Sequence, residues 1–547
     1  MKRFLTLLLC GVLLVSMCPA VLAADAGAVY YVDSTNGNDD NSGTSASAAW
    51  KTLERAASET YAAGDKILLK AGEIFDGTFA AKGNATAENP ITFGAYADIE
   101  TLGKPIVRTD KDVILFRLHN VSGWTVENIE FTAPNGKGMY ITADGSGMTT
   151  EITVKDCVFH DIYFKRCPTY NGGHCPIMLS SSGATARLRN ITLKDCNIYD
   201  CAYGVNMGGL TREWTPDLFT TPEESYNTGY RLDGLNLHNI LYDAVIITSV
   251  YDMVIRNCVL LDTCLYDDYF TAPMWSHHAS NYVIENCEIG GAKNYKDGMA
   301  VDFDGWTTDA TCQYIYSHDN IRFITNCIYD NYTKNRNCTV RYCLSVNDNK
   351  KMNILAQLCT AGIVYGEDEE AVYMDNFKFY NNTLVNASSI RCCNLKNAYI
   401  ANNIITGNPK TVVEVLGRTI DADGNKVIRA FDGVMTNNCF RGMGAPWSAE
   451  NSLFCDPGFL GTDITDRDSF MLCAESKLLG KGVQVEPDMG ACDLYGNPLT
   501  DAHNIGCYDG AGEDGKSAAS LWDNITARLQ SWVGRVYTAW VNINNIL

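Results

Sequence analysis

The sequence predicts an all-β fold, a right-handed parallel β-helix solenoid with an N-terminal capping helix and a short C-terminal helix. The main observation is a repeat in which alternating apolar residues lead to Asp or Asn, as in ITVKDCVFHD (152–161) and KFYNNTLVN (378–386). A second short strand, such as DAVIITS (243–249), follows in most repeats. One such unit cannot bury its apolar face alone, so the units have to stack. Strands that return in the same direction then form parallel sheets, with coils about 4.8 Å apart.

The repeats align on one residue each, at irregular spacings that suit coils with loops of variable length. These anchors are Asp156, Asp195, Asn239, Asn257, Asn286, Tyr314, Tyr342, Asn381, Asn402 and Asn438. The residue after the anchor is usually Cys or Asn, and cysteine is a small apolar side chain that is often buried. This column predicts an internal stack of free thiols and amides, comprising Cys157, Cys196, Cys258, Cys287, Cys343, Asn382, Asn403 and Cys439.

Five positions after the anchor stands a second column of Asp and Asn. These side chains terminate strands by bonding nearby backbone amides, so the column is mainly a turn device. Its members are Asp161, Asp200, Asp262, Asp319, Asn347 and Asn386.

Both ends of the repeat region differ from its middle. Residues 50–62 have helical periodicity and precede the first strand, as a helix covering an open β-helix end would. Residues 517–547 also place apolar side chains at helical spacing. We expect this segment to pack on the end of the solenoid or to dock on a surface or partner. The predicted organisation is therefore 24–510 for the β-helix with its caps and 517–547 for the C-terminal helix.

Residues 1–23 have the features of a secretory signal peptide. Lys2 and Arg3 precede an apolar run from Phe4 to Val15, and a small-residue pattern ends at Ala23. We therefore expect a secreted, extracellular protein. No later stretch has the roughly 18 apolar residues that a membrane span needs.

The charge balance bears on the partner. The chain has 43 basic and 64 acidic side chains, for a formal net charge of −21. Such a surface repels phosphate backbones, which disfavours nucleic acid, and mildly disfavours polyanionic glycans. The HExxH, GxSxG and phosphate-loop motifs are absent from the sequence. We expect a monomer acting on a polysaccharide.

Three stretches resemble secreted carbohydrate-active β-helix proteins of the pectate-lyase-like superfamily. They are the N-terminal YYVDSTNGNDDNSGTSASAAWKTLERA with AGDKILLKAGEIFDGT, the central AVDFDGWTTDATCQYIYSHDN, and the segment from Asp456-Pro457-Gly458-Phe459 to Asn504-Ile505-Gly506. The resemblance implies the fold and an extracellular glycan as partner. It does not imply one reaction, because the superfamily contains lyases, hydrolases, esterases and non-catalytic surface proteins.

Asp302 and Asp304 form the sharpest candidate site. Alternate residues of a strand share a face, so Val301 and Phe303 are expected in the core and both aspartates on the solvent side. Two carboxylates on one face can be the acid and the base or nucleophile of glycoside cleavage, with their repulsion raising one pKa, or they can ligate calcium. Asp319 is a candidate third carboxylate, although it also falls in the turn column.

Other side chains are expected near these aspartates because coils stack closely. His277 and His278 end the strand before them, and Lys296 and Asp297 lie at the turn between. Aromatic rings stack on apolar sugar faces, and Trp275 and Trp306 are expected to be the better exposed of the rings in this region. The candidate substrate-binding residues are Trp275, Trp306, Tyr269, Tyr295 and Arg322.

Three functions remain open. A glycoside hydrolase would use Asp302 and Asp304 and needs no cofactor. A polysaccharide lyase acting on uronates would use Lys296 as base and calcium, with Asp267, Asp268 and Asp297 as candidate ligands beside the diacid. A non-catalytic glycan-binding surface protein would need no reactive carboxylates.

Overall fold

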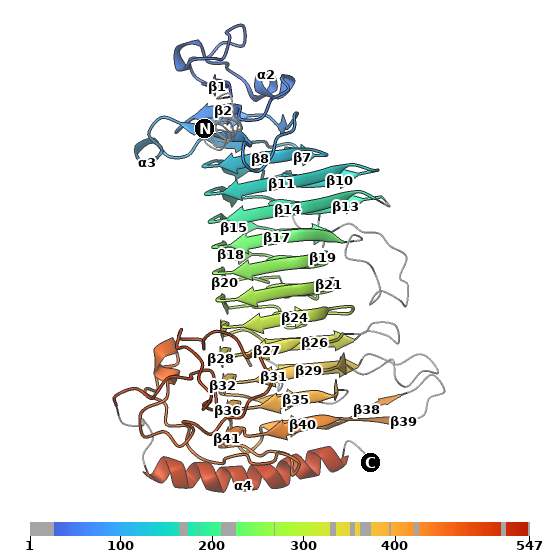
Figure 1. Cartoon of the computed structure of the whole chain (residues 1–547), viewed down its shortest axis with the longest axis vertical. Coiled ribbons are helices and arrows are strands. Elements are labelled where there is room, and N and C mark those ends of the chain that lie inside the picture. The colour runs from blue at the N-terminus through green and yellow to red at the C-terminus, as the bar shows by residue number, and fades with distance from the viewer. Residues whose placement is uncertain are drawn as a thin grey trace, which may run out of the picture.

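The computed structural model describes residues 27–163, 173–183, 185–208, 226–266, 269–328, 335–349, 356–361, 374–392, 395–420, 426–515 and 521–544. The predicted signal segment and the candidate ligands Asp267 and Asp268 lie outside these residues. The described chain winds into a solenoid whose coils stack along the long axis from the N-terminal to the C-terminal end (Figure 1). This confirms the predicted right-handed parallel β-helix.

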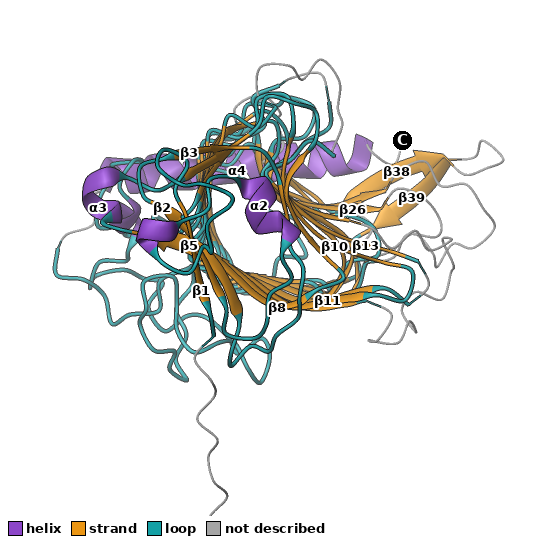
Figure 2. Ribbon diagram, turned by 90° about the horizontal axis from the view of Figure 1, so that it is seen from above, coloured by secondary structure: helices purple, strands orange, loops and turns teal. Residues whose placement is uncertain are grey.

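Each coil contributes strands to three stacks, seen end-on in Figure 2. The first stack, which carries the candidate site, contains β4 (Phe79–Ala80), β7 (Ile114–His119), β10 (Lys137–Asp144), β13 (Ile177–Ser182), β16 (Val205–Gly208), β19 (Val245–Arg256), β21 (Met274–Glu285), β23 (Met299–Phe303), β26 (Arg322–Ile328), β29 (Ala356–Ala361), β33 (Ser389–Arg391) and β37 (Val412–Glu414).

The second stack continues around the corner from the first, and the long strands β19 and β21 belong to both. Its other members are β1 (Val29–Val32), β2 (Lys66–Lys70), β5 (Ile91–Tyr96), β8 (Ser122–Glu127), β11 (Met148–Lys155), β14 (Arg187–Lys194), β17 (Asn227–Asp233), β24 (Thr308–Gln313), β27 (Thr339–Arg341), β31 (Lys378–Tyr380), β35 (Ala398–Ala401) and β40 (Gly433–Thr436).

The third stack is a separate sheet of 13 strands. It contains β3 (Ile74–Asp76), β6 (Ile106–Arg108), β9 (Glu130–Thr132), β12 (Val158–His160), β15 (Asn197–Cys201), β18 (Asn236–Ile240), β20 (Val259–Leu261), β22 (Glu288–Gly290), β25 (Tyr316–His318), β28 (Leu344–Val346), β32 (Thr383–Val385), β36 (Ile404–Thr406) and β41 (Cys439–Arg441). Two small pairs lie beside the stacks, β30 (Met374–Asp375) with β34 (Leu395–Lys396) and β38 (Leu416–Ile420) with β39 (Lys426–Ala430).

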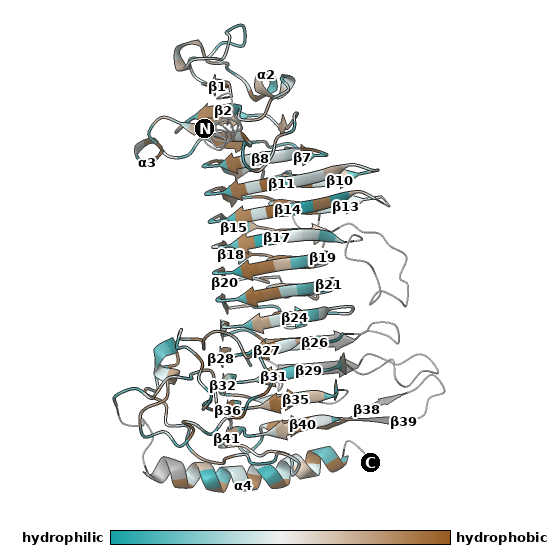
Figure 3. Ribbon diagram, in the orientation of Figure 1, coloured by the Kyte–Doolittle hydropathy of each residue, from teal (hydrophilic) through white to brown (hydrophobic). Residues whose placement is uncertain are grey.

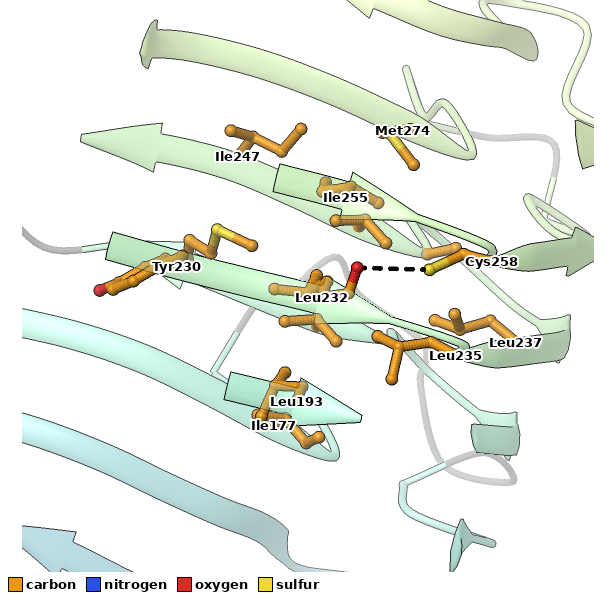
Figure 4. Packing of buried hydrophobic residues seen from close by; sticks show 14 of the residues in the cluster. Ile177, Leu193, Tyr230, Leu232, Leu235, Leu237, Ile247, Ile255, Cys258 and Met274 are labelled. Atoms are coloured by element: carbon orange, nitrogen blue, oxygen red, sulfur yellow. Dashed lines mark hydrogen bonds between the residues drawn. The ribbon is translucent and has the colours of Figure 1, made fainter. Parts of the chain in front are cut away.

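The core runs through the solenoid as a continuous apolar column. Hydrophobic segments recur on successive strands such as β19 and β21 (Figure 3), and like side chains lie above one another. Phe131 and Phe159, on neighbouring coils, stack with ring centroids 4.9 Å apart. Figure 4 shows the same interdigitation around Leu232 and Ile255.

The anchor residues sit at tight corners in the left-handed backbone region. Asp156, Asp195, Asn257 and Asn286 all have φ near +50°, a conformation that Asn, Asp and Gly tolerate best. Two predicted anchors, Asn239 and Asn438, were wrong. Gly234, with φ of +69°, occupies the corner predicted for Asn239.

Asn239 instead belongs to the turn column, where its amide donates to Asp200. In the last coil Asn437 is the corner residue, with φ of +51°. The predicted corner, Asn438, is one residue too far along the chain, because Asn437 and Asn438 fit the repeat pattern equally well.

The internal column of thiols and amides is confirmed for most of its members. The Asn403 Oδ1 accepts from the Asn382 backbone N (3.0 Å) and side-chain N (3.1 Å), and Asn403 Nδ2 donates to Asn438 Oδ1 (2.9 Å). Asn438 therefore takes the place predicted for Cys439, which pairs with Ile404. The cysteines of the column are free thiols, and Cys258 directs its thiol to the Leu232 carbonyl (Figure 4).

Helices cover both ends of the solenoid. Helix α2 (Leu53–Ser58) lies over the interior of the first coils (Figure 2), and Thr52 caps it by accepting from Arg55 N at 3.1 Å. It is shorter than the predicted 50–62, because the backbone turns extended at Glu59. Helix α4 (Leu521–Asn544) lies across the other end (Figure 1). The short helices are α3 (Ile99–Leu102), η1 (Ala46–Ala48) and η6 (Arg467–Phe470). No helix among the described residues combines the length of a membrane span with the apolar character that it needs.

Substituting Asn403 by Ala tests the amide ladder. The change removes the acceptor of the buried Asn382 backbone N and one of the two acceptors of Asn382 Nδ2, and it removes the side-chain donor to the Phe379 carbonyl at 2.9 Å. We expect the free energy of unfolding to fall by about 3 kcal/mol, measured as a shift in the urea midpoint. Asn135→Ala removes one exposed hydrogen bond, to the Asp110 carbonyl, and should change stability by less than about 1 kcal/mol. Equal effects of the two substitutions would contradict a structural ladder.

Candidate functional site

The diacid lies on strand β23 and just beyond it, in the middle of the first stack. Asp302 pairs with Trp275 of β21 on one side and Thr325 of β26 on the other. The Asp304 backbone N donates to Ser276 O at 2.9 Å, which continues the ladder past the end of the strand. Val301 and Phe303 are buried in the core as predicted, so the aspartates leave the sheet on its outer face.

The expectation that this outer face is open to solvent was wrong. Asp302 is 5% and Asp304 8% exposed, because the loop before β21 folds over them. Together they line a cavity of about 320 Å³, bounded by Tyr269, Phe270, Thr271, Ala272, Trp275, Asp297, Asp302 and Asp304. Alternation along a strand gives the direction of a side chain but carries no information about a loop that covers it.

The surroundings of Asp302 favour its protonated, neutral form. Burial, followed by the charges of Asp304 and Asp297, raises its pKa well above the usual range, and Arg322 only partly opposes this. Among the described residues, its Oδ1 is buried without a hydrogen-bond partner. A buried polar atom without a partner calls for an explanation, and a ligand bound in the cavity that Asp302 lines would supply one.

Asp297 is the third carboxyl group of the cavity. Burial raises its pKa to about 6, against the opposing charge of Arg322, whose Nη1 lies 3.9 Å from Asp297 Oδ1. Its proton therefore exchanges near neutral pH, the range in which a general acid or base is most effective. The sequence placed Asp297 near the diacid, but as a metal ligand.

Asn294 positions the turn that carries Asp297, and sequence reasoning missed it. This fully buried amide accepts from the backbone N atoms of Lys296 (2.8 Å) and Asp297 (3.4 Å). Its Nδ2 donates to the carbonyls of Tyr266 and Tyr269. One side chain thus ties the Asp297 turn to the loop that covers the cavity.

A polar network lies inside the coil directly beneath the diacid. Asn335 Nδ2 donates to the Phe303 carbonyl at 2.9 Å, which fixes the peptide between the two aspartates. Ser276 Oγ lies 3.0 Å from Thr307 Oγ1 and accepts from the Tyr282 hydroxyl at 2.7 Å. Buried polar networks rigidify their surroundings when satisfied. No sequence pattern marked these residues, because they occupy positions that are apolar in other coils.

His277 and His278 lie beside the end of the diacid segment. The His278 backbone N donates to Gly305 O at 3.2 Å, which sets His277 next to Asp304 in the register. The two histidine Nδ1 atoms are 3.0 Å apart. Burial and His277 lower the pKa of His278 to about 3, so it remains neutral. Trp306 stacks on His278 at 5.9 Å and is only 4% exposed, so the expectation of an exposed Trp306 was wrong.

Aromatic side chains form one wall of the cavity. Tyr269 and Trp275 line it as predicted, together with Phe270, which is 71% exposed and was not predicted. Behind them Tyr203 and Tyr242 stack at 5.0 Å, and Tyr269 packs against Tyr242. Tyr295 is exposed and outside the described lining of the cavity.

Two predicted reactive residues lie away from the lining. Asp319 occupies its turn column with φ of +58° and pairs with His318 at 3.3 Å. Lys296 is exposed, with its Nζ 5.4 Å from the centroid of the Phe270 ring. Within the described residues, no three His, Cys, Asp or Glu side chains gather as metal ligands. The described carboxyl groups of the cavity therefore do not form a calcium site by themselves, and the candidate ligands Asp267 and Asp268 lie outside the described residues.

Comparison with known proteins gives likenesses of two kinds. No family model matches the chain. A lacto-N-biosidase of Bifidobacterium longum subsp. longum is 37% identical over 91 residues, which are 16% of this chain and 6% of that protein. The similarity therefore covers a small part of either protein.

The second kind is a likeness of fold. The crystal structure of a GH136 lacto-N-biosidase from Eubacterium ramulus has a TM-score of 0.51 at 19% identity, covering 70% of this chain and 65% of that one. The structure of XylC with xylose has a TM-score of 0.50 at 10% identity, covering 89% and 99%. Identities this low show a shared fold, which agrees with the β-helix described above.

The raised pKa of Asp297 predicts a pH-dependent cost to stability. With a pKa near 6 in the folded chain and 3.8 as its ordinary value, Asp297 ionises first in the unfolded chain, so stability is lost as pH rises from about 4 to 6. Asp297→Asn should therefore be more stable than the parent at pH 7 by up to about 3 kcal/mol, and equal to it at pH 4. Urea denaturation at both pH values measures this. A difference independent of pH would contradict the buried carboxyl.

Proposed function

We propose that the protein is a secreted glycoside hydrolase that cleaves a neutral or weakly acidic extracellular glycan in the cavity between Trp275 and the three aspartates. The observation that carries the proposal is the convergence of Asp297, Asp302 and Asp304 on one cavity with an aromatic wall. The similarities to two lacto-N-biosidases support a carbohydrate-active enzyme. Secretion rests on the sequence of residues 1–23.

The three carboxyl groups divide the chemistry according to their surroundings. Asp297, with a pKa of about 6, protonates the glycosidic oxygen as the bond to the sugar breaks. Asp304 supplies the carboxylate that attacks the anomeric carbon or activates a water molecule. Asp302, kept neutral by burial and by its neighbours, hydrogen-bonds to Asp304 and holds it in place. If Asp304 attacks the anomeric carbon, Asp297, now a carboxylate, takes a proton from the water that cleaves the glycosyl–enzyme bond. If Asp304 instead activates the water, it takes the water's proton and releases it to solvent, from which Asp297 is reprotonated.

The substrate class follows from the charge of the cavity. Three carboxyl groups line it, and the cation beside them, Arg322, faces Asp297. With Asp302 neutral, the carboxylates of Asp297 and Asp304 balance the charge of Arg322, so the described lining offers a uronate no surplus positive charge, and an uncharged sugar needs none. Trp275, Tyr269 and Phe270 offer ring faces to the apolar faces of sugars.

The lyase alternative has less support. Its proposed base, Lys296, lies over Phe270 rather than in the lining of the cavity, and its candidate ligands Asp267 and Asp268 are outside the described residues. In a non-catalytic binding protein, three carboxyl groups sharing a buried site would lower stability without serving a reaction.

Glycan cleavage is the direct test. The purified chain is incubated with a panel of neutral and uronate-containing glycans, with and without chelator. We expect new reducing ends without new absorbance near 235 nm. Asp304→Asn should lower kcat by at least about 1,000-fold, because it removes the carboxylate that the transition state needs. Asp319→Asn, a turn carboxylate next to a histidine, should keep most of the activity.

The same assay distinguishes the alternatives. Absorbance near 235 nm that a chelator abolishes would establish the lyase and shift the base to Lys296. Glycan binding without cleavage, retained in Asp304→Asn, would establish a binding protein.

The pH profile tests the role of Asp297. As a general acid it must be protonated, so kcat should fall as the pH rises above about 6. Asp297→Asn should be slow and its residual activity should lack that limb. If the substituted enzyme kept the limb, the titrating group would be another residue.

A further inference from the structure

Several corners of the solenoid are closed by the same device, which we call an asparagine clip. The Nδ2 of a buried asparagine donates to a backbone carbonyl of the preceding coil, and its Oδ1 accepts from a backbone N a few residues further along. Asn403 is an example, because it donates to Phe379 O at 2.9 Å and accepts from Asn382 N at 3.0 Å. Four clips of the described chain join a carbonyl to the N atom three residues later, namely Asn320 (Ile289 to Ala292), Asn382 (Val340 to Cys343), Asn403 (Phe379 to Asn382) and Asn438 (Ile400 to Asn403).

The clip at the diacid encloses one residue more. Asn335 donates to Phe303 O at 2.9 Å and accepts from Thr307 N at 2.9 Å, so it joins a carbonyl to the N atom four residues later. Asp304 directly follows the clipped carbonyl and lies beyond the last residue of β23. The corner that carries this carboxyl group is therefore an enlarged form of a corner that the fold repeats elsewhere.

The enlarged corner also contains a strained residue. Just before the last clipped residue stands Trp306, with φ of +64°, at the place where Asn381 stands in the clip of Asn403. A left-handed backbone is unfavourable for a bulky side chain and persists only where the surroundings hold it. His278 of the preceding coil donates from its backbone N to Gly305 O at 3.2 Å and stacks its ring on Trp306 at 5.9 Å. The strained corner is thus held by both His278 and the asparagine clip.

We infer that Asn335 is a positioning residue, which holds the enlarged corner in the conformation that directs the Asp304 carboxyl group into the cavity. This inference rests on the proposed function of Asp304. Asn335 is fully buried and outside the described lining of the cavity, so it acts through Asp304 and not on a sugar. Without the clip the peptide between Phe303 and Asp304 is released, and a displacement of about 1 Å at a reacting group costs about 100-fold in rate.

The kinetics of Asn335→Ala test this role. The substitution removes the acceptor of Thr307 N and the side-chain donor to Phe303 O, so the corner relaxes. We expect kcat for the cleaved glycan to fall about 100-fold while KM stays within about twofold of the parent. The loss of activity above about pH 6 that is assigned to Asp297 should remain, because Asn294 holds the turn of Asp297 separately.

Asn403→Ala is the matched control. It breaks a clip with partners of the same type, including donation to a second asparagine, which is Asn438 for Asn403 (2.9 Å) and Asn326 for Asn335 (2.8 Å). Both variants should lower the urea midpoint, but Asn403→Ala should keep kcat within about twofold of the parent. Equal losses of kcat in the two variants, or an unchanged kcat in Asn335→Ala, overturn the inference. If Asn335→Ala does not fold, Asn335→Ser, whose shorter side chain cannot bridge the two clipped groups, replaces it with the same expected result.

Crystal structures of the parent, of the folded Asn335 variant and of Asn403→Ala test the inference without any activity. We expect the carboxyl carbon of Asp304 to move by about 1 Å or more relative to Asp297 in the Asn335 variant alone. If the parent cleaves no glycan, the proposed function fails, and this displacement still decides whether Asn335 positions Asp304. An Asp304 that stays in place overturns the inference.

Discussion

Parallel hydrogen bonding between successive coils must keep its register at every corner, because a slip of one residue would exchange the inside and outside of all later strands. The corners that hold this register adopt left-handed backbone conformations, at Asp156, Asn257 and Asn286 among others. Within the corners, buried groups such as Asn382 and Asn403 tie one coil to the next. The position of every outward side chain, including Asp302, depends on these corners.

The candidate site is a local departure from this regular plan. Most of the interior is apolar, but beneath β23 it contains Ser276, Thr307 and Asn335 in a hydrogen-bonded network. On the outside, Asn294 fastens a loop over carboxyl groups that a regular coil would leave in water. The polar groups inside the coil and the carboxyl groups beneath the loop both lower the stability of the fold. The regular coils stacked on either side are rigid and stable enough to accommodate them.

Repetition and strand alternation made the fold and the direction of Asp302 and Asp304 predictable from the sequence. What could not be predicted depends on contacts between segments far apart in the chain. The burial of the diacid comes from a loop, and the burial of Trp306 comes from His278 of the preceding coil. Gly234 was not predicted as a corner because the repeat pattern was defined mainly by Asp and Asn, although glycine adopts the same left-handed backbone conformation. Asn294 and Asn335 act through backbone groups, which leave no mark in the sequence.

The buried cysteines of the protein, in the column and outside it, have a consequence for its chemical durability. Burial raises the pKa of Cys338 and Cys507 to about 12, and only the thiolate reacts with disulfides and peroxides. Neighbouring thiols such as Cys157 and Cys196 interact with each other, yet lie where oxidants reach them only if the coils separate. As long as the solenoid stays closed, these buried sulfur atoms only fill space in the core, and their oxidation should report on opening of the coils rather than on the oxidant around them.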